Sequence, residues 1–92
     1  MDILRIWFET YDGGKTIERS KIYHNIDPES IVAYGTEMYF AHPGSWQGNL
    51  LANRYRIPLK NSIIKTDPQA IKAYAESHKE TINRGLYVTE AA

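Results

Sequence analysis

The chain has 92 residues, of which 42% are apolar and 24% charged, and this length and composition suit one folded domain over residues 1–92 rather than a disordered chain. Eleven basic residues balance eleven acidic ones, which excludes a global positive field that would draw the molecule to nucleic acid or to an anionic membrane. The absence of cysteine excludes disulfides, thiolate chemistry and cysteine metal sites.

The first predicted element is a β-hairpin. Residues 3–10 alternate with the period of a half-buried strand, which places Leu4, Ile6 and Phe8 on one side and Arg5, Trp7 and Glu9 on the other. The sequence Asp-Gly-Gly at 12–14 predicts a tight turn, so residues 15–24 are expected to return as the partner strand. With that loop, Leu4 lies opposite Ile22 and Trp7 opposite Arg19. A short helix within 16–25 is the alternative for the second strand.

Two stretches forty residues apart open in the same way. Residues 27–34 read DPESIVAY and residues 67–74 read DPQAIKAY. An Asp at the N-cap accepts a hydrogen bond from the first turn, and a Pro at the next position has a backbone angle suited to a helix. We therefore predict helices over 28–41 and 68–84, the first ended by Pro43 and Gly44 and the second by Gly85.

The segments around these helices predict a loop and short strands. Residues 43–53 carry two glycines and no sustained period, which indicates a loop that contains Trp46. Residues 54–59 alternate as a strand in which Pro58 favours an edge or a bulge, and 63–64 and 86–89 are candidates for further strands. The predicted fold class is α+β: a small antiparallel sheet, made of the N-terminal hairpin plus one or two further strands, with two helices packed on one face.

The two predicted helices differ on their outer faces. The later helix has a buried stripe of Ile71, Tyr74, Ala75, His78 and Ile82, and its opposite face carries Lys72, Glu76, Lys79, Glu80 and Arg84. The earlier helix repeats the stripe with Ile31, Tyr34, Gly35, Met38 and His42. Its outer positions, however, replace the ions with apolar groups and one hydroxyl, at Val32, Thr36, Tyr39 and Phe40.

An apolar outer face of this kind is expected to be buried against another segment or another molecule. One interpretation is that the loop around Trp46 or the strand at 54–59 folds over it, which would make the helix a doubly buried element. The other is that a macromolecular partner docks on it, since aromatic residues dominate interface energetics and contiguous apolar patches are uncommon on monomers. The predicted partner-binding residues are Val32, Thr36, Tyr39, Phe40 and Trp46.

Chemical motifs are few, so we expect no enzyme, no cofactor and no metal site. The three histidines, His24, His42 and His78, lack short ligand spacing, and the glycines around Ser45 match neither a nucleophile elbow nor a phosphate-binding loop. His78 is predicted as a core histidine on the apolar stripe, and His42 as a charge at the C-terminus of the earlier helix.

A nucleic-acid surface is the alternative function. Aromatic and basic residues lie together in the second half of the chain, a mixture that stacks bases and neutralises phosphates, at Trp46, Arg54, Tyr55, Arg56, Lys60 and Lys65. The zero net charge counts against strong binding of free nucleic acid. The arginines of this set could equally be the solvated side of a strand.

The function predicted from the sequence is binding of a protein or ribonucleoprotein, with a homodimer as the alternative occupant of the surface. In size and composition the chain resembles in kind the small proteins, of the anti-CRISPR sort, with which phages and mobile elements inhibit host defence or nucleoprotein machines. No apolar run approaches the length of a membrane span, so we expect a cytoplasmic protein without membrane contact.

Overall fold

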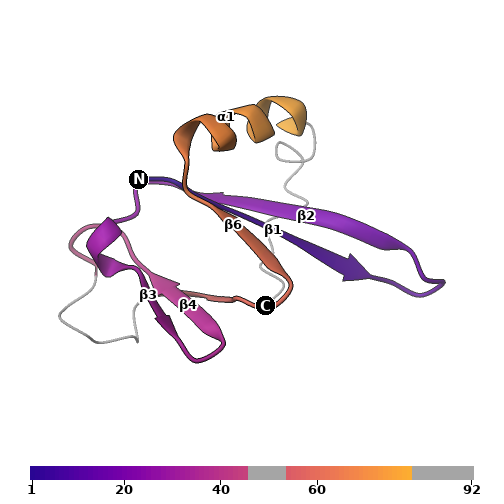
Figure 1. Cartoon of the computed structure of the whole chain (residues 1–92), viewed down its shortest axis with the longest axis horizontal. Helices are drawn as coiled ribbons and strands as arrows, with labels where there is room; N and C mark the ends of the chain where they lie inside the picture. The colour runs from indigo at the N-terminus through magenta and orange to yellow at the C-terminus, as the bar shows by residue number, and fades with distance from the viewer. Residues whose placement is uncertain (46–53, 80–92) are drawn as a thin grey trace.

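A computed structural model describes residues 1–45 and 54–79 of the protein (Figure 1). Its elements in chain order are β1 (Ile3–Thr10), β2 (Thr16–Tyr23), the 3-10 turn η1 (Pro28–Ser30), β3 (Val32–Tyr34), β4 (Glu37–Phe40), β5 (Tyr55–Pro58), β6 (Ser62–Lys65) and α1 (Pro68–Ser77). The strands form two antiparallel sheets, ordered β2-β1-β6 and β3-β4-β5. The α+β class is confirmed. The arrangement of two helices on one sheet is wrong, because the described residues contain one α-helix and two three-stranded sheets.

The N-terminal hairpin forms as predicted. Leu4 pairs with Ile22 and Trp7 with Arg19, so the expected register is confirmed and the short helix is wrong. Gly13 and Gly14 adopt φ values of +90° and +81°, which residues with side chains rarely adopt. The turn chemistry therefore set both the loop and the register.

The predicted helix over 28–41 is wrong. Asp27 does cap a turn, since its carboxylate accepts a hydrogen bond from the Glu29 amide at 3.0 Å, but that turn is only η1. The chain then becomes extended at Ile31 and folds into the hairpin of β3 and β4, which reverses at Gly35 with φ +63°. β-branched and aromatic residues dominate this stretch and favour strand over helix.

The later Asp-Pro motif does start a helix. Asp67 accepts a hydrogen bond from the Gln69 amide at 3.2 Å, and α1 follows. Within the described residues the predicted stripe is confirmed: Ile71 is buried and Tyr74, Ala75 and His78 are half-buried, whereas Lys72, Glu76 and Lys79 are exposed. The predicted end of this helix, the strand at 86–89, and the loop positions 46–53 lie outside the described residues.

The strand predictions for 54–59 and 63–64 are confirmed as β5 and β6. β5 is at the edge of its sheet, as Pro58 suggested, and β6 pairs with β1 in the other sheet. Residues 59–61 connect the two strands; the Ser62 amide donates to the Leu59 carbonyl at 3.2 Å, and Asn61 adopts φ +64°. The two sheets are therefore joined by a turn of three residues.

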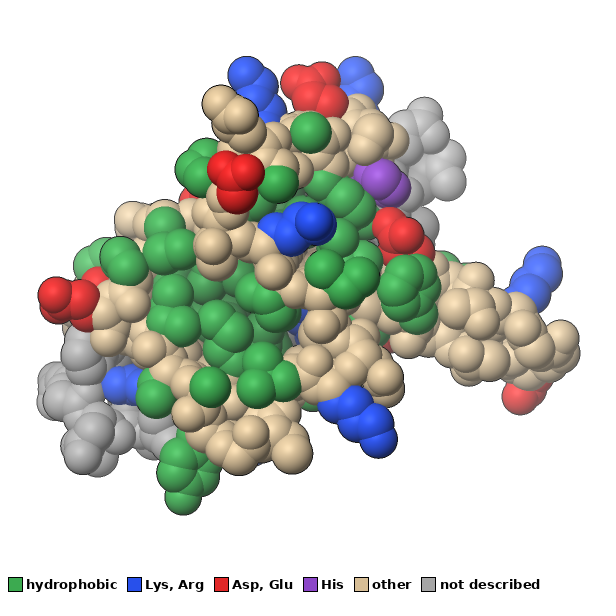
Figure 2. All heavy atoms as spheres, viewed as in Figure 1, with side chains coloured by type: hydrophobic (Ala, Val, Ile, Leu, Met, Phe, Trp, Pro, Cys, Tyr) green, Lys and Arg blue, Asp and Glu red, His purple; other side chains and the backbone are tan. Residues whose placement is uncertain are grey.

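Two apolar clusters share β1. The first lies where the two sheets meet and contains Ile3, Tyr23, Ile26, Phe40 and Ile57, with Ile31, Met38 and Ile64 packed against it. The second lies beneath α1 and contains Leu4, Ile6 and Ile71, with Ile22 and Tyr74. In Figure 2 hydrophobic side chains gather below α1 and again in the region of β4, with charged side chains between and around the two areas.

The expectation of a half-buried β1 is wrong over residues 3–7, all of which are buried. Leu4 and Ile6 face α1, while Ile3 on the opposite side faces the sheet of β3, β4 and β5. Only beyond the reach of α1 does a large apolar side chain of β1, Phe8, become exposed, at 50%. The alternation of polar and apolar residues in β1 therefore did not indicate a solvent-facing side.

Candidate functional site

The register of β3, β4 and β5 sorts their side chains onto two faces. Met38 lies opposite Ile57, and Phe40 opposite Tyr55, on the face that closes the first apolar cluster. Because side chains alternate along a strand, the intervening residues lie on the other face. We call this second set the outer face, and its members are Val32, Tyr34, Glu37, Tyr39, Arg56 and Pro58.

The outer face exposes apolar and aromatic groups. Tyr34 is 67% exposed and Val32 38% exposed, Pro58 is exposed, and Tyr39 is half-buried. Val32 lies directly opposite Tyr39, which in turn lies opposite Arg56, so the three form one row across the sheet. Paired side chains in such a row are close enough to make a continuous surface.

The charges of the outer face neutralise each other. The Glu37 carboxylate lies 3.5 Å from the Arg56 Nε and accepts a hydrogen bond from the Tyr39 hydroxyl at 2.8 Å. That hydrogen bond raises the pKa of Tyr39, because it stabilises the neutral phenol as the donor to the carboxylate. The face therefore presents two tyrosines, a valine and a proline around one compensated ion pair.

The structure separates the predicted partner-binding residues. Val32 and Tyr39 are neighbours on the outer face, and Thr36 is exposed in the adjoining turn, where its carbonyl accepts a hydrogen bond from the Leu59 amide at 2.9 Å. Phe40 is fully buried by the chain's own residues, because adjacent residues of a strand point to opposite faces. The helical spacing that grouped Phe40 with Tyr39 is wrong. Trp46 lies outside the described residues.

The alternative nucleic-acid residues do not share one surface. Arg56 is on the outer face, whereas the Tyr55 ring lies on the inner face, 5.2 Å from Tyr23 and 5.6 Å from Phe40 between ring centroids. Arg54 is half-buried, and Lys60 is exposed in the turn between β5 and β6. Lys65, also exposed, ends β6 in the other sheet.

Three residues of the outer face were missed from the sequence: Tyr34, Glu37 and Pro58. Tyr34 was assigned to the core stripe of a helix, and it is instead the most exposed of the large apolar side chains in the described residues. The signal that would have found it is the alternation on both sides of Gly35, which is typical of a hairpin with glycine in its turn.

The histidines make local contacts. The Nδ1 of His42 lies 3.1 Å from the Asn25 carbonyl and its Nε2 lies 2.9 Å from the Tyr55 hydroxyl, and since no helix ends there the predicted dipole interaction is wrong. His78 is half-buried rather than in the core, and stacks on Tyr74 with ring centroids 3.9 Å apart. His24 lies 3.2 Å from the Asp2 carboxylate.

Comparisons with protein-family models, with curated proteins and with solved structures found no match. Over residues 1–45 and 54–79, no three side chains of His, Asp or Glu gather closely enough to hold a metal ion. In the same part of the chain no helix is both long and apolar enough to cross a membrane. The outer face is therefore the feature on which a functional proposal can be based.

Proposed function

We propose that this protein acts without catalysis, by binding a protein partner through the outer face. The observation that carries the proposal is the exposure of Tyr34 next to Val32 and Tyr39 on one side of a hydrogen-bonded sheet. Tyrosine and arginine are enriched at protein interfaces, and they provide many of the residues on which binding energy depends. Of the six residues of the outer face, three are tyrosine or arginine.

The arrangement favours a protein over a nucleic acid. Nucleic-acid affinity depends on cations that neutralise phosphates, and the Arg56 guanidinium already lies beside the Glu37 carboxylate. An exposed valine and proline also have no role in stacking bases, whereas they supply apolar area to a protein contact. Lys60 lies in the turn after β5 and Lys65 ends β6 in the other sheet, so neither belongs to the outer face.

The size of the outer face limits the kind of complex. A standard interface buries about 800 Å² on each partner and involves about 20 to 30 residues, far more than the six residues named here. The outer face would therefore be the centre of a larger contact that also includes the exposed turn at Gly35 and Thr36. An inhibitor of a host defence or nucleoprotein complex, of the kind that phages use, is the narrower form of this proposal and is supported by size and composition alone.

Affinity capture with matched variants tests the proposal. Tyr34→Glu places a charge at the centre of the outer face, and we expect it to abolish capture of a partner that the wild-type protein retains. Because Tyr34 is largely exposed, the change should alter the free energy of unfolding by no more than about 0.5 kcal/mol. Phe8→Glu is the matched control, since Phe8 is similarly exposed but lies on the other sheet. Equal capture by wild type and Tyr34→Glu would contradict the proposal.

Two measurements distinguish a protein partner from a second copy of the chain and from a nucleic acid. Light scattering across a concentration series would reveal a homodimer, and Tyr34→Glu should dissociate it if the outer face is the contact. Gel-shift assays with short RNA and single-stranded DNA at several salt concentrations test the nucleic-acid alternative. Binding that falls steeply with salt and survives Tyr34→Glu would support that alternative over a protein partner.

A further inference from the structure

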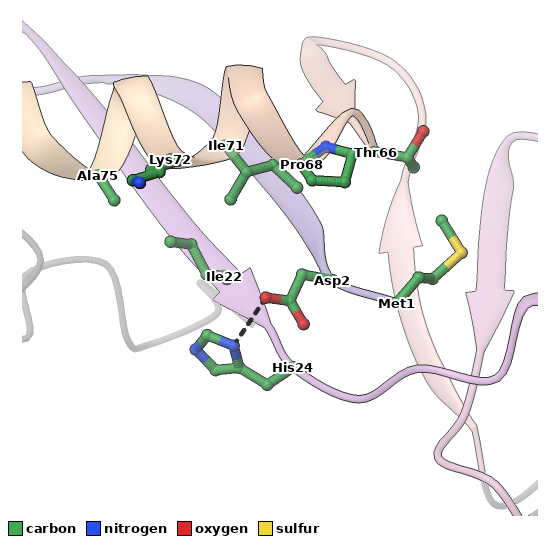
Figure 3. Close-up of a pocket in the computed structure, with 9 residues that line it drawn as sticks. All are labelled: Met1, Asp2, Ile22, His24, Thr66, Pro68, Ile71, Lys72 and Ala75. Carbon is green, nitrogen blue, oxygen red and sulfur yellow. Dashed lines mark hydrogen bonds and ion pairs between the residues drawn. The ribbon is translucent and has the colours of Figure 1, made fainter.

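A groove lies between α1 and the ends of β1 and β2, on a different part of the molecule from the outer face (Figure 3). Its volume is about 460 Å³. Ile71, Lys72 and Ala75 line it from the helix, and Ile22, Asp2 and His24 line it from the strand ends. In Figure 3 Ile71 and Ala75 point down from the helix toward Ile22, with Asp2 and His24 on the opposite side of the opening.

The helical wall results from the spacing of α1. Pro68, Ile71, Lys72 and Ala75 are at positions i, i+3, i+4 and i+7, which places them along one side of the helix. Ile71 is buried against Leu4 and Ile6, and so fixes the distance of the helix from the sheet. Ala75 has a small side chain, which leaves space between the helix and Ile22. The groove therefore forms because the large residue Ile71 is followed one turn later, on the same side of α1, by the small residue Ala75.

The charged side chains at the opening of the groove differ in whether they have a partner. The Asp2 carboxylate is occupied, since one oxygen lies 3.2 Å from the His24 Nδ1 and the other accepts a hydrogen bond from the Asn25 amide at 3.2 Å. Lys72 is exposed, and within the described part of the chain it makes no ion pair. The groove therefore combines apolar walls with one cation that lacks a partner among the described residues.

We propose that this groove binds a small amphipathic carboxylate, with its hydrocarbon body against Ile22, Ile71 and Ala75 and its carboxylate beside the Lys72 ammonium. Ligand sites of about 300 to 1,000 Å³ that are mostly apolar, with few polar groups to fix orientation, are typical for small molecules. A ligand carboxylate supplies the anionic partner that Lys72 lacks among the described residues. The site is separate from the outer face, so the proposal does not depend on protein binding.

Decanoate is the probe that tests the site, titrated below its micelle concentration into the protein while amide resonances are followed. We expect saturable binding at one site, with shift changes concentrated at Ile22, Ile71 and Ala75. Lys72→Gln should weaken binding about 3- to 10-fold, the range of a partly solvated charge-assisted contact. Lys79→Gln is the matched control, because Lys79 is an exposed lysine of the same terminal region that does not line the groove.

Filling the groove gives a second variant. Ala75→Phe should abolish decanoate binding while the protein keeps its fold, which its amide spectrum would report. Equal affinity for decanoate in the wild type and Lys72→Gln, or equal affinity of the wild type for decanol, would overturn recognition of the carboxylate. Shift changes at the groove on concentration of the protein, without any effect of decanoate, would overturn the proposal in favour of a second copy of the chain.

Discussion

Ser30 is a buried hydroxyl that joins two segments of the chain. Its Oγ donates to the Asp27 carbonyl at 2.7 Å and accepts from the Ala41 amide at 2.8 Å. The Asp27 amide also donates to the Ala41 carbonyl, so η1 is attached to the residue immediately after β4. A buried amide that loses its acceptor costs more than the hydrogen bond itself, because it cannot return to water.

The first prediction concerns this hydroxyl. Ser30→Ala should lower the free energy of unfolding by about 1 to 3 kcal/mol, since the Ala41 amide would be buried without its partner. For a domain of this size, thermal denaturation should show a fall in Tm of roughly 4 to 8 °C for each kcal/mol. Ser45→Ala is the control at an exposed position and should leave Tm unchanged. Equal Tm values for the two variants would contradict the assigned role of Ser30.

Tyr74 attaches α1 to β2. Its hydroxyl donates to the Glu18 carboxylate, and the same carboxylate lies 3.4 Å from the His78 Nε2. Burial, with a further contribution from the hydrogen bond to Glu18, raises the pKa of Tyr74 to about 12. Folding therefore favours the neutral phenol, whose pKa in the unfolded chain is near 10.

The second prediction derives from that pKa. The stabilisation by neutral Tyr74 is fully present below about pH 10 and is lost as the pH rises toward 12, because the folded state resists deprotonation that the unfolded state accepts. The difference in urea midpoint between wild type and Tyr74→Phe should therefore be constant from pH 8 to pH 9. From pH 10 to pH 12 the midpoint of the wild type should fall relative to that of Tyr74→Phe. The comparison with phenylalanine removes the contribution of the other tyrosines and lysines. A difference that stays constant up to pH 12 would show that Tyr74 is not perturbed by folding.

At the scale of elements, one capping motif has two outcomes. Asp27 and Asp67 both accept a hydrogen bond from the amide two residues later, yet the first begins a turn of three residues and the second a helix of ten. A cap satisfies the first amides of a helix and has no influence beyond that turn. The residues after the cap decide whether a helix continues. After Asp27 an Ile-Val pair and then a glycine lead into a hairpin, whereas after Asp67 an amphipathic stripe continues as a helix.

The third prediction distinguishes a hairpin from a helix at Gly35. In the hairpin its φ is +63°, and a side chain there meets no neighbour within 4 Å, so the cost of substitution comes from the backbone. Gly35→Ala should lower the free energy of unfolding by about 1 kcal/mol, and Gly35→Asn by less, since Asn adopts positive φ more readily. In a helix interior the same change to Ala would stabilise by about 1 kcal/mol. Urea denaturation therefore tests the structure by the sign of the effect.

Sequence reasoning succeeded where local chemistry decides the structure. The Asp-Gly-Gly turn determined the loop and register of the first hairpin, and the stripe through Ile71 determined the buried side of α1. Sequence reasoning failed over residues 31–40, because the apolar residues of this segment fit both a helical spacing and the two-residue period of a strand. Tyr39 and Phe40 share a face only in a helix, and in a strand they point to opposite faces. The outer face arises from pairing between segments far apart in sequence, such as Tyr39 with Arg56, which no local pattern indicates.

At the scale of the whole molecule, Phe40 couples the two sheets. It is fully buried, and its ring lies 4.9 Å from that of Tyr23 in the other sheet. Ile57 and Ile3 extend the same cluster from either side. Neither sheet closes this cluster alone, which indicates that the two sheets fold as one cooperative unit.

The fourth prediction tests this coupling. Phe40→Ala should lower the free energy of unfolding by about 3 to 5 kcal/mol, the usual cost of removing a buried ring, whereas Tyr34→Ala should change it by no more than about 0.5 kcal/mol. In the wild type, amide signals of β1 and β4 should disappear at the same urea concentration. Separate transitions for the two strands, or similar losses of stability in the two variants, would contradict a shared core.

The turn of residues 59–61 has a consequence for recognition. It joins β5, which carries Arg56 and Pro58 on the outer face, to β6, which is hydrogen-bonded to the buried strand β1. So short a connection gives the edge strand little freedom to reorient, so the outer face, which we propose as the binding surface, is already ordered in the free protein. Less conformational entropy would then be lost on association with the proposed partner, so a modest contact area would suffice for stable binding.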